Sequence, residues 1–183
     1  MRCRAIADEW ERLGHGAAVP AYASVLLRFD GLRLAPADAE LIAERLARDA
    51  RGSAEGTGRL VEIPTRYDGA DLADTAARSG IAVDELIALH SGREYRVFFL
   101  GFLPGFAYCG TLDPRIVAPR LERPRERVPR GAVAIADGQT AVYPVDSPGG
   151  WRLIGSTDLV VFDPDAQSAA RLAAGDRIRF VPR

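Results

Sequence analysis

Residues 93–110 read REYRVFFLGFLPGFAYCG, and this stretch decides the fold class. Its first half is rich in aromatic and β-branched residues, which predicts a strand over 93–100. Gly101, Pro104 and Gly105 then interrupt the pattern, because glycine permits left-handed backbone and proline stiffens a bend. The loop they form either presents backbone N–H groups and aromatic rings to a small ligand, or packs its rings as the corner of a barrel.

The segments on either side of this stretch are short, strand-like and separated by turn-forming residues. Upstream, residues 60–65 predict a strand, and 72–79 and 84–90 predict two short helices. Many short strands with frequent turns are typical of a barrel or sandwich, so we place a β-rich domain at 58–183. Downstream, further strands are expected at 132–136, 140–143, 152–154, 159–162 and 177–181.

The N-terminal region, residues 1–52, shows a different pattern and is expected to form a separate small α/β domain. Apolar residues around Trp10 recur at helical spacing. Residues 22–29 are rich in β-branched and aromatic residues, which predicts a strand, and Pro36 suits the first turn of a second helix. Residues 51–58 are small and polar without periodicity, so they are the expected linker.

The composition is that of a globular protein with no strong overall charge. Apolar residues make up 48% of the 183 residues, charged residues 27%, and the formal net charge is −1. This balance gives no global field toward nucleic acid or a membrane surface, and we expect neither as a partner. The N-terminus lacks an apolar leader segment, so we expect a cytoplasmic protein. All basic residues are arginine, which excludes chemistry that depends on a lysine side chain.

An arginine-rich segment and a glycine-rich segment are candidates for polar recognition. Residues 119–130, PRLERPRERVPR, combine arginines with prolines and do not fit a helix interior. This segment either binds an anion or is a solvated loop whose arginines pair with Glu122 and Glu126. Residues 147–151, SPGGW, form either a backbone nest for an oxyanion or a plain hairpin turn.

Gln139 and Tyr143 lie four residues apart in a predicted strand. Residues at this spacing point to the same face, so their polar groups are expected on one side of the sheet. A glutamine amide donates and accepts hydrogen bonds, which suits recognition of another amide or of a lactam.

His90 ends the second of the two predicted short helices. Its near-neutral pKa suits a general acid or base, but a histidine in the last turn also complements the helix dipole. The two histidines are far apart in sequence, as are Cys3 and Cys109, so no zinc-ligand spacing is present and no metal site is expected. Both cysteines are expected to be reduced thiols. The chain also lacks a P-loop, a Rossmann glycine fingerprint and a nucleophile elbow.

Several motifs in a fixed order resemble those of the 5-oxoprolinase B-subunit family, also known as the allophanate hydrolase subunit 1 or KipI family. The likeness covers most of the β-rich domain. The motifs are ELIALHSG at 85–92, GFLPGFAY at 101–108, GAVAI at 131–135, QTAVYP at 139–144, SPGGWRLIGST at 147–157 and GDRIRF at 175–180.

This resemblance implies an α+β chain in which a C-terminal cyclophilin-like β-barrel follows a small ferredoxin-like α/β domain. Family members usually begin with one more strand before the first helix. The resemblance therefore implies an incomplete N-terminal domain with an open sheet edge.

The resemblance also implies an activity. It predicts the B subunit of an ATP-dependent 5-oxoprolinase, which hydrolyses 5-oxo-L-proline to L-glutamate together with subunits C and A. ATP is then the expected cofactor of the complex, and an amide-like small molecule is the expected substrate. Gln139 and Tyr143 are expected to hydrogen-bond the substrate amide, and His90 is expected to transfer or orient a proton.

The remaining expected site residues bind an anion. The family often carries arginine at the position of Ser156, so if that arginine contacts an anion, either a lower anion affinity or a different substrate is expected here. The residues expected to hold a carboxylate or phosphate are Arg120, Arg125 and Arg127, with backbone donors from Gly149 and Gly150.

Two other functions fit the same resemblance. A KipI-like inhibitor of a histidine kinase would keep the fold but tolerate changes at Gln139 and His90. A carboxyltransferase component acting on urea or a similar amide would depend strictly on biotin.

Overall fold

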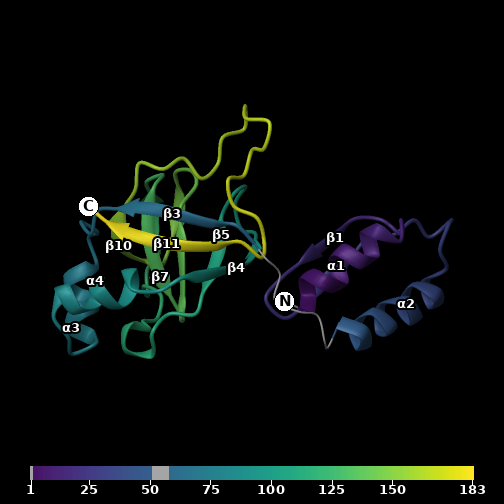
Figure 1. Ribbon diagram of the computed structural model, residues 1–183, viewed down its shortest axis with the longest axis horizontal. Helices are drawn as coiled ribbons and strands as arrows, with labels where there is room; N and C mark the ends of the chain where they lie inside the picture. The colour runs from purple at the N-terminus through teal and green to yellow at the C-terminus, as the bar shows by residue number, and fades with distance from the viewer. Residues whose placement is uncertain (1, 51–57) are drawn as a thin grey trace. The chain divides into compact units, whose positions relative to one another are not determined.

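The computed structural model describes residues 2–50 and 58–183, and the chain divides into two compact units (Figure 1). Unit 1 is Met1–Thr57 and unit 2 is Gly58–Arg183. Apart from Gly58, the linker expected at 51–58 lies outside the described residues.

The described part of unit 1, residues 2–50, contains two α-helices and a two-stranded antiparallel sheet. Trp10 is fully buried in its core, and the indole N–H donates to the carbonyl of Arg28 at 3.1 Å. Both expected helices are present, and Pro36 begins the second one. The strand expected at 22–29 is shorter, because a tight turn precedes it in which the N–H of Ala21 donates to the carbonyl of Ser24. The elements are α1 (Arg2–Arg12), β1 (Ala18–Pro20), β2 (Val25–Leu27) and α2 (Pro36–Asp49).

Unit 2 is built on a seven-stranded sheet in the order β10-β7-β8-β5-β4-β11-β3. All neighbouring strands in it are antiparallel except β11 and β3, which are parallel. Its strands are β3 (Leu60–Thr65), β4 (Tyr95–Leu100), β5 (Ala107–Gly110), β7 (Ala132–Ala136), β8 (Gln139–Val142), β10 (Arg152–Ser156) and β11 (Arg177–Pro182).

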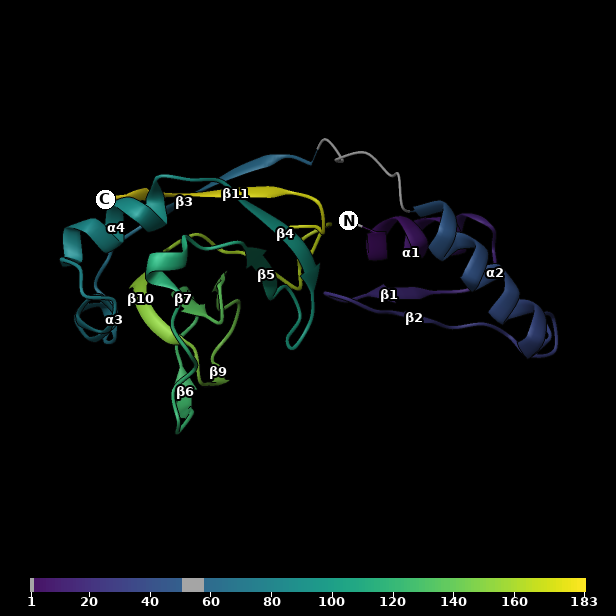
Figure 2. The same ribbon diagram turned by 90° about the horizontal axis from the view of Figure 1, so that it is seen from below.

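The two outer strands of this sheet nearly close it into a barrel, as the curved ribbon in Figure 2 indicates. An antiparallel bridge joins Arg66, directly after β3, to Ser156 at the end of β10. The Arg66 N–H donates to the Ser156 carbonyl at 2.8 Å, and the Ser156 N–H donates back at 2.7 Å. The expected mixed α+β, barrel-like architecture is therefore confirmed.

Smaller elements cover the sheet of unit 2. Helix α3 packs against β10, and α4 packs against β11. A separate two-stranded sheet lies beside the barrel. These elements are α3 (Leu72–Arg78), α4 (Val83–Ser91), the 3-10 helix Pro114–Ile116, β6 (Arg125–Val128) and β9 (Ser147–Gly149).

Strand β7 is buried along its whole length because each of its faces belongs to a different core. Val133 and Ile135 point into the main core, which also holds residues of α3 and α4. Ala132, Ala134 and Ala136 point to the opposite face, into a second cluster that we call the outer core. Alternation of side chains along the strand produces this division. The outer core also contains Phe106, Val128, Ala141, Tyr143, Trp151 and Leu153.

The expected strands at 60–65 and 132–136 are confirmed residue for residue. The strand expected at 159–162 is wrong, since only an isolated bridge between Phe162 and Ala170 forms there. Val161 is nevertheless buried in the main core, which explains the apolar pattern of that segment. Strands β1, β5, β6 and β9 were not predicted. Among the described residues, no helix is both long and apolar enough to cross a bilayer.

Closure of the barrel predicts a steric requirement at Gly155. A Cβ atom there would lie 2.4 Å from the carbonyl oxygen of Arg66, which belongs to the closing bridge. We expect Gly155→Ala to lower the free energy of unfolding by about 1–3 kcal/mol, because the backbone oxygen has to move. Urea unfolding followed by circular dichroism measures this. Gly101→Ala, whose Cβ would meet only the Phe99 ring at 3.5 Å, is the control and should cost no more than about 0.5 kcal/mol. Equal losses for both variants would contradict the steric account.

Candidate functional site

A cavity of about 250 Å³ opens over the outer core of unit 2 and is the candidate site. We refer to it as the aromatic pocket. Its walls include the rings of Phe106, Tyr108, Tyr143 and Trp151, and Arg120 contributes the charge. Gly149, Gly150 and prolines of the β6 and β9 region complete the lining.

The aromatic rings fix the shape of the pocket because they pack on one another. The Phe106 ring lies edge-on to Tyr143 at 5.2 Å, to Trp151 at 5.5 Å and to Tyr108 at 5.0 Å, between ring centres. Such edge-to-face contacts are favourable and restrict ring rotation. The wall is therefore a rigid part of the outer core that faces an open cavity.

The Tyr143 hydroxyl lies in the pocket directly beside Gly149. A Cβ atom on Gly149 would lie 2.2 Å from the Tyr143 oxygen, so only glycine fits there. Burial raises the pKa of Tyr143, so the phenol stays protonated at neutral pH. A protonated phenol carries one O–H hydrogen, which can donate to a ligand in the pocket.

Arg120 is the cation of the pocket. Its guanidinium carbon lies 5.9 Å from the centre of the Trp151 ring, within the range of a cation–π contact. Its Nε also donates to Asp137 at 3.2 Å. More than half of the Arg120 side chain is exposed, so it can reach a carboxylate in the cavity.

Four of the residues expected from the sequence thus meet at one place: Arg120, Tyr143, Gly149 and Gly150. SPGGW is part strand, since Ser147–Gly149 form β9. The sequence left open whether the rings of residues 101–108 face a ligand or pack in the core. Phe106 and Tyr108 line the pocket and also pack in the outer core, although neither was named as a site residue. The alternation of Phe106 and Tyr108 in GFAY was the signal that could have placed both rings on one face.

The other two expected arginines are engaged in ion pairs and do not line the pocket. Arg125 donates to Asp71 at 2.7 Å, and Arg127 donates to Asp146 at 2.9 Å. The acids that pair with these arginines are therefore distant aspartates, rather than the neighbouring glutamates considered from the sequence.

Gln139 is the first residue of β8, is partly exposed and does not line the pocket. By alternation it shares a face with Ala141 and Tyr143. Four residues of extended strand span about 13 Å, so the backbones of Gln139 and Tyr143 lie well apart along it.

His90 is fully buried in unit 2 and lies away from the pocket. Its Nδ1 is 2.8 Å from the Tyr67 hydroxyl, and its Nε2 is 2.9 Å from the Thr140 hydroxyl. Since Thr140 donates to the carbonyl of Ala134 at 3.1 Å, it accepts from His90, which places the imidazole hydrogen on Nε2. Burial lowers the pKa of His90 to about 3, so the ring is neutral and neither complements the helix dipole as a charge nor reaches a ligand in the pocket.

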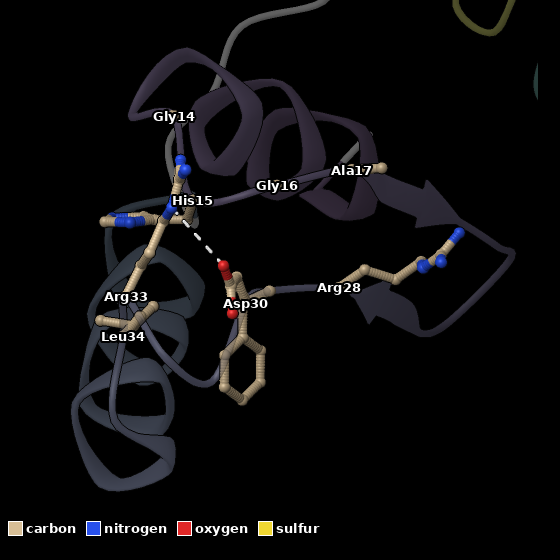
Figure 3. Close-up of a pocket in the computed structure, with 9 residues that line it drawn as sticks. Gly14, His15, Gly16, Ala17, Arg28, Asp30, Arg33 and Leu34 are labelled. Carbon is tan, nitrogen blue, oxygen red and sulfur yellow. Dashed lines mark ion pairs between the residues drawn. The ribbon is translucent and has the colours of Figure 1, made fainter.

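A larger hollow of about 690 Å³ lies in unit 1 (Figure 3). Its loops carry His15, Asp30 and Arg33, and a 3.5 Å ion pair joins Asp30 to Arg33. The Arg28 side chain extends away from that pair in Figure 3. Arg33 and Asp30 are largely exposed, so nothing fixes them toward a ligand as the packed rings fix Tyr143 in unit 2. We therefore take the aromatic pocket as the candidate site.

Comparison with known families finds a match that covers most of the chain, in both units. The sequence pattern described as carboxyltransferase domain, subdomain C and D, matches residues 2–172. This chain belongs to that family. Within residues 2–50 and 58–183, no group of three or more His, Cys, Asp or Glu side chains is arranged to hold a metal ion.

Relatives of this carboxyltransferase-family chain carry a common name. A protein of Escherichia coli O157:H7 named as the B subunit of 5-oxoprolinase is 46% identical over 76% of this chain and 66% of its own length. A protein of the same name from Bacillus subtilis (strain 168) is 44% identical over 76% of this chain and 59% of its own length. The solved structure of TTHA0988 has a TM-score of 0.86 at 39% identity, covering 100% of this chain and 36% of that one. The chain thus spans about three fifths to two thirds of the curated relatives it matches.

The burial of His90 predicts a specific dependence of stability on pH. The pKa falls from 6.5 to about 3 on folding, so between these values the unfolded chain takes up a proton that the folded chain does not. Stability is fully present above pH 6.5 and should fall by about 1.4 kcal/mol per pH unit below it. Urea unfolding at pH 7, 6 and 5 should show this extra slope in the wild type and in His15→Gln, but not in His90→Gln. Identical slopes in all three proteins would contradict the burial of a neutral imidazole.

Proposed function

We propose that this chain is the B subunit of an ATP-dependent 5-oxoprolinase and that its aromatic pocket binds the lactam substrate. In this proposal the complex hydrolyses 5-oxo-L-proline to L-glutamate, and subunits C and A are the partners. The observation that carries it is the placement of the Tyr143 hydroxyl and the Arg120 guanidinium on one aromatic wall. The relatives that bear the 5-oxoprolinase name support it.

The chemistry of the pocket matches the parts of this substrate. 5-Oxoproline has a flat lactam ring, a carbonyl oxygen and one carboxylate. The rings of Phe106 and Trp151 offer surfaces for the lactam ring, Tyr143 donates to the carbonyl, and Arg120 receives the carboxylate. A hydrogen bond to the carbonyl stabilises the negative charge that forms there when the amide bond is attacked.

Gln139 and His90 take supporting roles in this proposal, which changes their assignment from the sequence. His90 hydrogen-bonds Thr140 and thereby fixes β8, the strand that leads to Tyr143. Gln139 begins the same strand, next to the turn that carries Asp137. Neither residue acts on the substrate directly.

A partner protein is part of the proposal because the pocket is open at its rim. Phe102 lies at this rim with 62% of its surface exposed and its ring edge-on to Phe106. Exposed aromatic residues beside a cavity are typical of surfaces that another protein covers. We assign ATP to the complex, without assigning it to this chain, because opening an unstrained lactam near neutral pH needs coupling to a favourable reaction.

The finer fold names belong to the same proposal. The closing bridge of the seven-stranded sheet supports a cyclophilin-like barrel for unit 2. Two helices with a small antiparallel sheet support a ferredoxin-like unit 1. A cytoplasmic location also remains a proposal.

Removal of the Tyr143 hydroxyl tests this function. The chain is co-expressed with the candidate subunits C and A, and glutamate release from 5-oxoproline is measured with and without ATP. We expect Tyr143→Phe to lower kcat/KM roughly 10²-fold, because a donor to the developing oxyanion is lost. Tyr22→Phe, an exposed tyrosine of unit 1, is the matched control and should leave kcat/KM unchanged.

Two outcomes would count against the proposal. Unchanged turnover in Tyr143→Phe would remove the aromatic pocket from the reaction. A wild-type complex that releases no glutamate with ATP, or that needs biotin to act on an amide, would contradict 5-oxoprolinase activity and favour amide carboxylation.

A further inference from the structure

Backbone geometry places Asp137 close to Arg120. Their ion pair therefore does not depend on the side-chain conformations alone. Asp137 and Gly138 form the turn between β7 and β8, with φ values of 49° and 83°. Asp-Gly with both residues at positive φ is the preferred pair for a tight hairpin turn. The N–H of Asp137 also donates to the carbonyl of Ala118 at 2.9 Å, which ties this turn to the segment that carries Arg120.

The two partners differ in their relation to the aromatic pocket. Arg120 lines it and lies over the Trp151 ring, whereas Asp137 is outside its lining. The guanidinium therefore contacts both the carboxylate of Asp137 and the ring of Trp151. Both charged side chains are more than half exposed, so the ion pair is weak enough for another carboxylate to replace it.

We infer that Asp137 is a specificity-determining residue, which competes with the carboxylate of the ligand for Arg120. This inference rests on the proposed function and deepens it. A ligand that carries a carboxylate has to displace Asp137 from the guanidinium, whereas a neutral ligand of the same shape does not. Simple anions therefore bind weakly, and a carboxylate binds well only when the rest of the molecule contacts the aromatic wall and Tyr143.

Asparagine is the substitution that separates this role from a role in the turn. Asn and Asp both tolerate positive φ, and Asn-Gly is a preferred pair for the same turn. Asp137→Asn therefore removes the charge and keeps the backbone. Asp158→Asn is the matched control, because it removes one carboxylate from an exposed ion pair, with Arg66, that does not line the pocket.

The experiment measures ligand binding to the full chain by the fluorescence of Trp151. Trp10, the other tryptophan, is fully buried in unit 1 and gives a constant background. The probes are 5-oxoproline, 2-pyrrolidinone, which has the lactam ring without the carboxylate, and acetate, which has the carboxylate alone. Melting temperatures confirm that each variant is folded.

We expect Asp137→Asn to tighten binding of 5-oxoproline and acetate by about two- to five-fold, the range of an exposed ion pair, and to leave 2-pyrrolidinone unchanged. Asp158→Asn should change none of the three affinities. Unchanged or weaker binding of both carboxylates in a folded Asp137→Asn chain would overturn the inference, as would equal tightening of all three probes.

The acetate arm separates this inference from the proposed function. If acetate binds more tightly to Asp137→Asn but neither lactam perturbs Trp151, Asp137 controls anion access and the lactam proposal fails. If both lactams bind but Asp137→Asn changes neither carboxylate affinity, the pocket assignment stands and the inference fails. If no probe binds, both are overturned.

Discussion

Burial of β7 and β8 on both faces is the constraint on which the rest of unit 2 depends. Val133, Ile135 and Val142 pack into the main core on one face of these strands, and Ala134 and Ala141 pack into the outer core on the other. The outward residues of β7 are all alanine, so large rings can lie directly on the sheet. The aromatic pocket is the exposed side of this ring layer. Its geometry is therefore set by the same packing that stabilises the fold, which makes the pocket largely preformed.

Buried polar residues also stabilise this burial of β7 and β8. Thr140 is fully buried on the same face of β8 as the main-core residue Val142, where a hydroxyl without a partner would cost about 1–3 kcal/mol. His90 and the Ala134 carbonyl supply its partners, and Tyr67 completes the chain of hydrogen bonds. This series of hydrogen bonds joins α4 to the middle of the sheet. A histidine that looks like an acid or base in sequence is thus a neutral structural link in the folded protein.

The sequence predicted the elements whose pattern is local. Residues 132–136 read as a strand because they are small and apolar, and Pro36 marked a helix start. Strands β6 and β9 were missed because proline and charged residues interrupt them, and their pairing depends on a contact between Arg125 and Gly149 that is distant in sequence. The apolar run at 159–162 was interpreted as a strand. Its apolar character instead reflects the burial of Val161 in the main core.

The candidate site was also predictable only where its sequence signal is local. Tyr143 and the paired glycines were chosen for their polar groups. The reason for glycine at Gly149, its contact with the Tyr143 oxygen, appears only once β9 is placed beside that ring. The ion pairs that engage Arg125 and Arg127 also join residues far apart in the chain. Residue type therefore indicated the chemistry. Which residues share the pocket depends on the tertiary packing of the nearly closed sheet.

The central claim is that the ring layer over β7 and β8 forms a lactam-binding pocket. The most direct measurement is a titration of the ¹⁵N-labelled full chain with 5-oxoproline, followed by nuclear magnetic resonance. The account predicts that the largest shift changes fall on the backbone amides of Tyr143, Gly149 and Trp151 and on the Nε of Arg120. Changes concentrated at Gly14, His15 and Gly16 around the hollow of unit 1, or no changes at all, would contradict it.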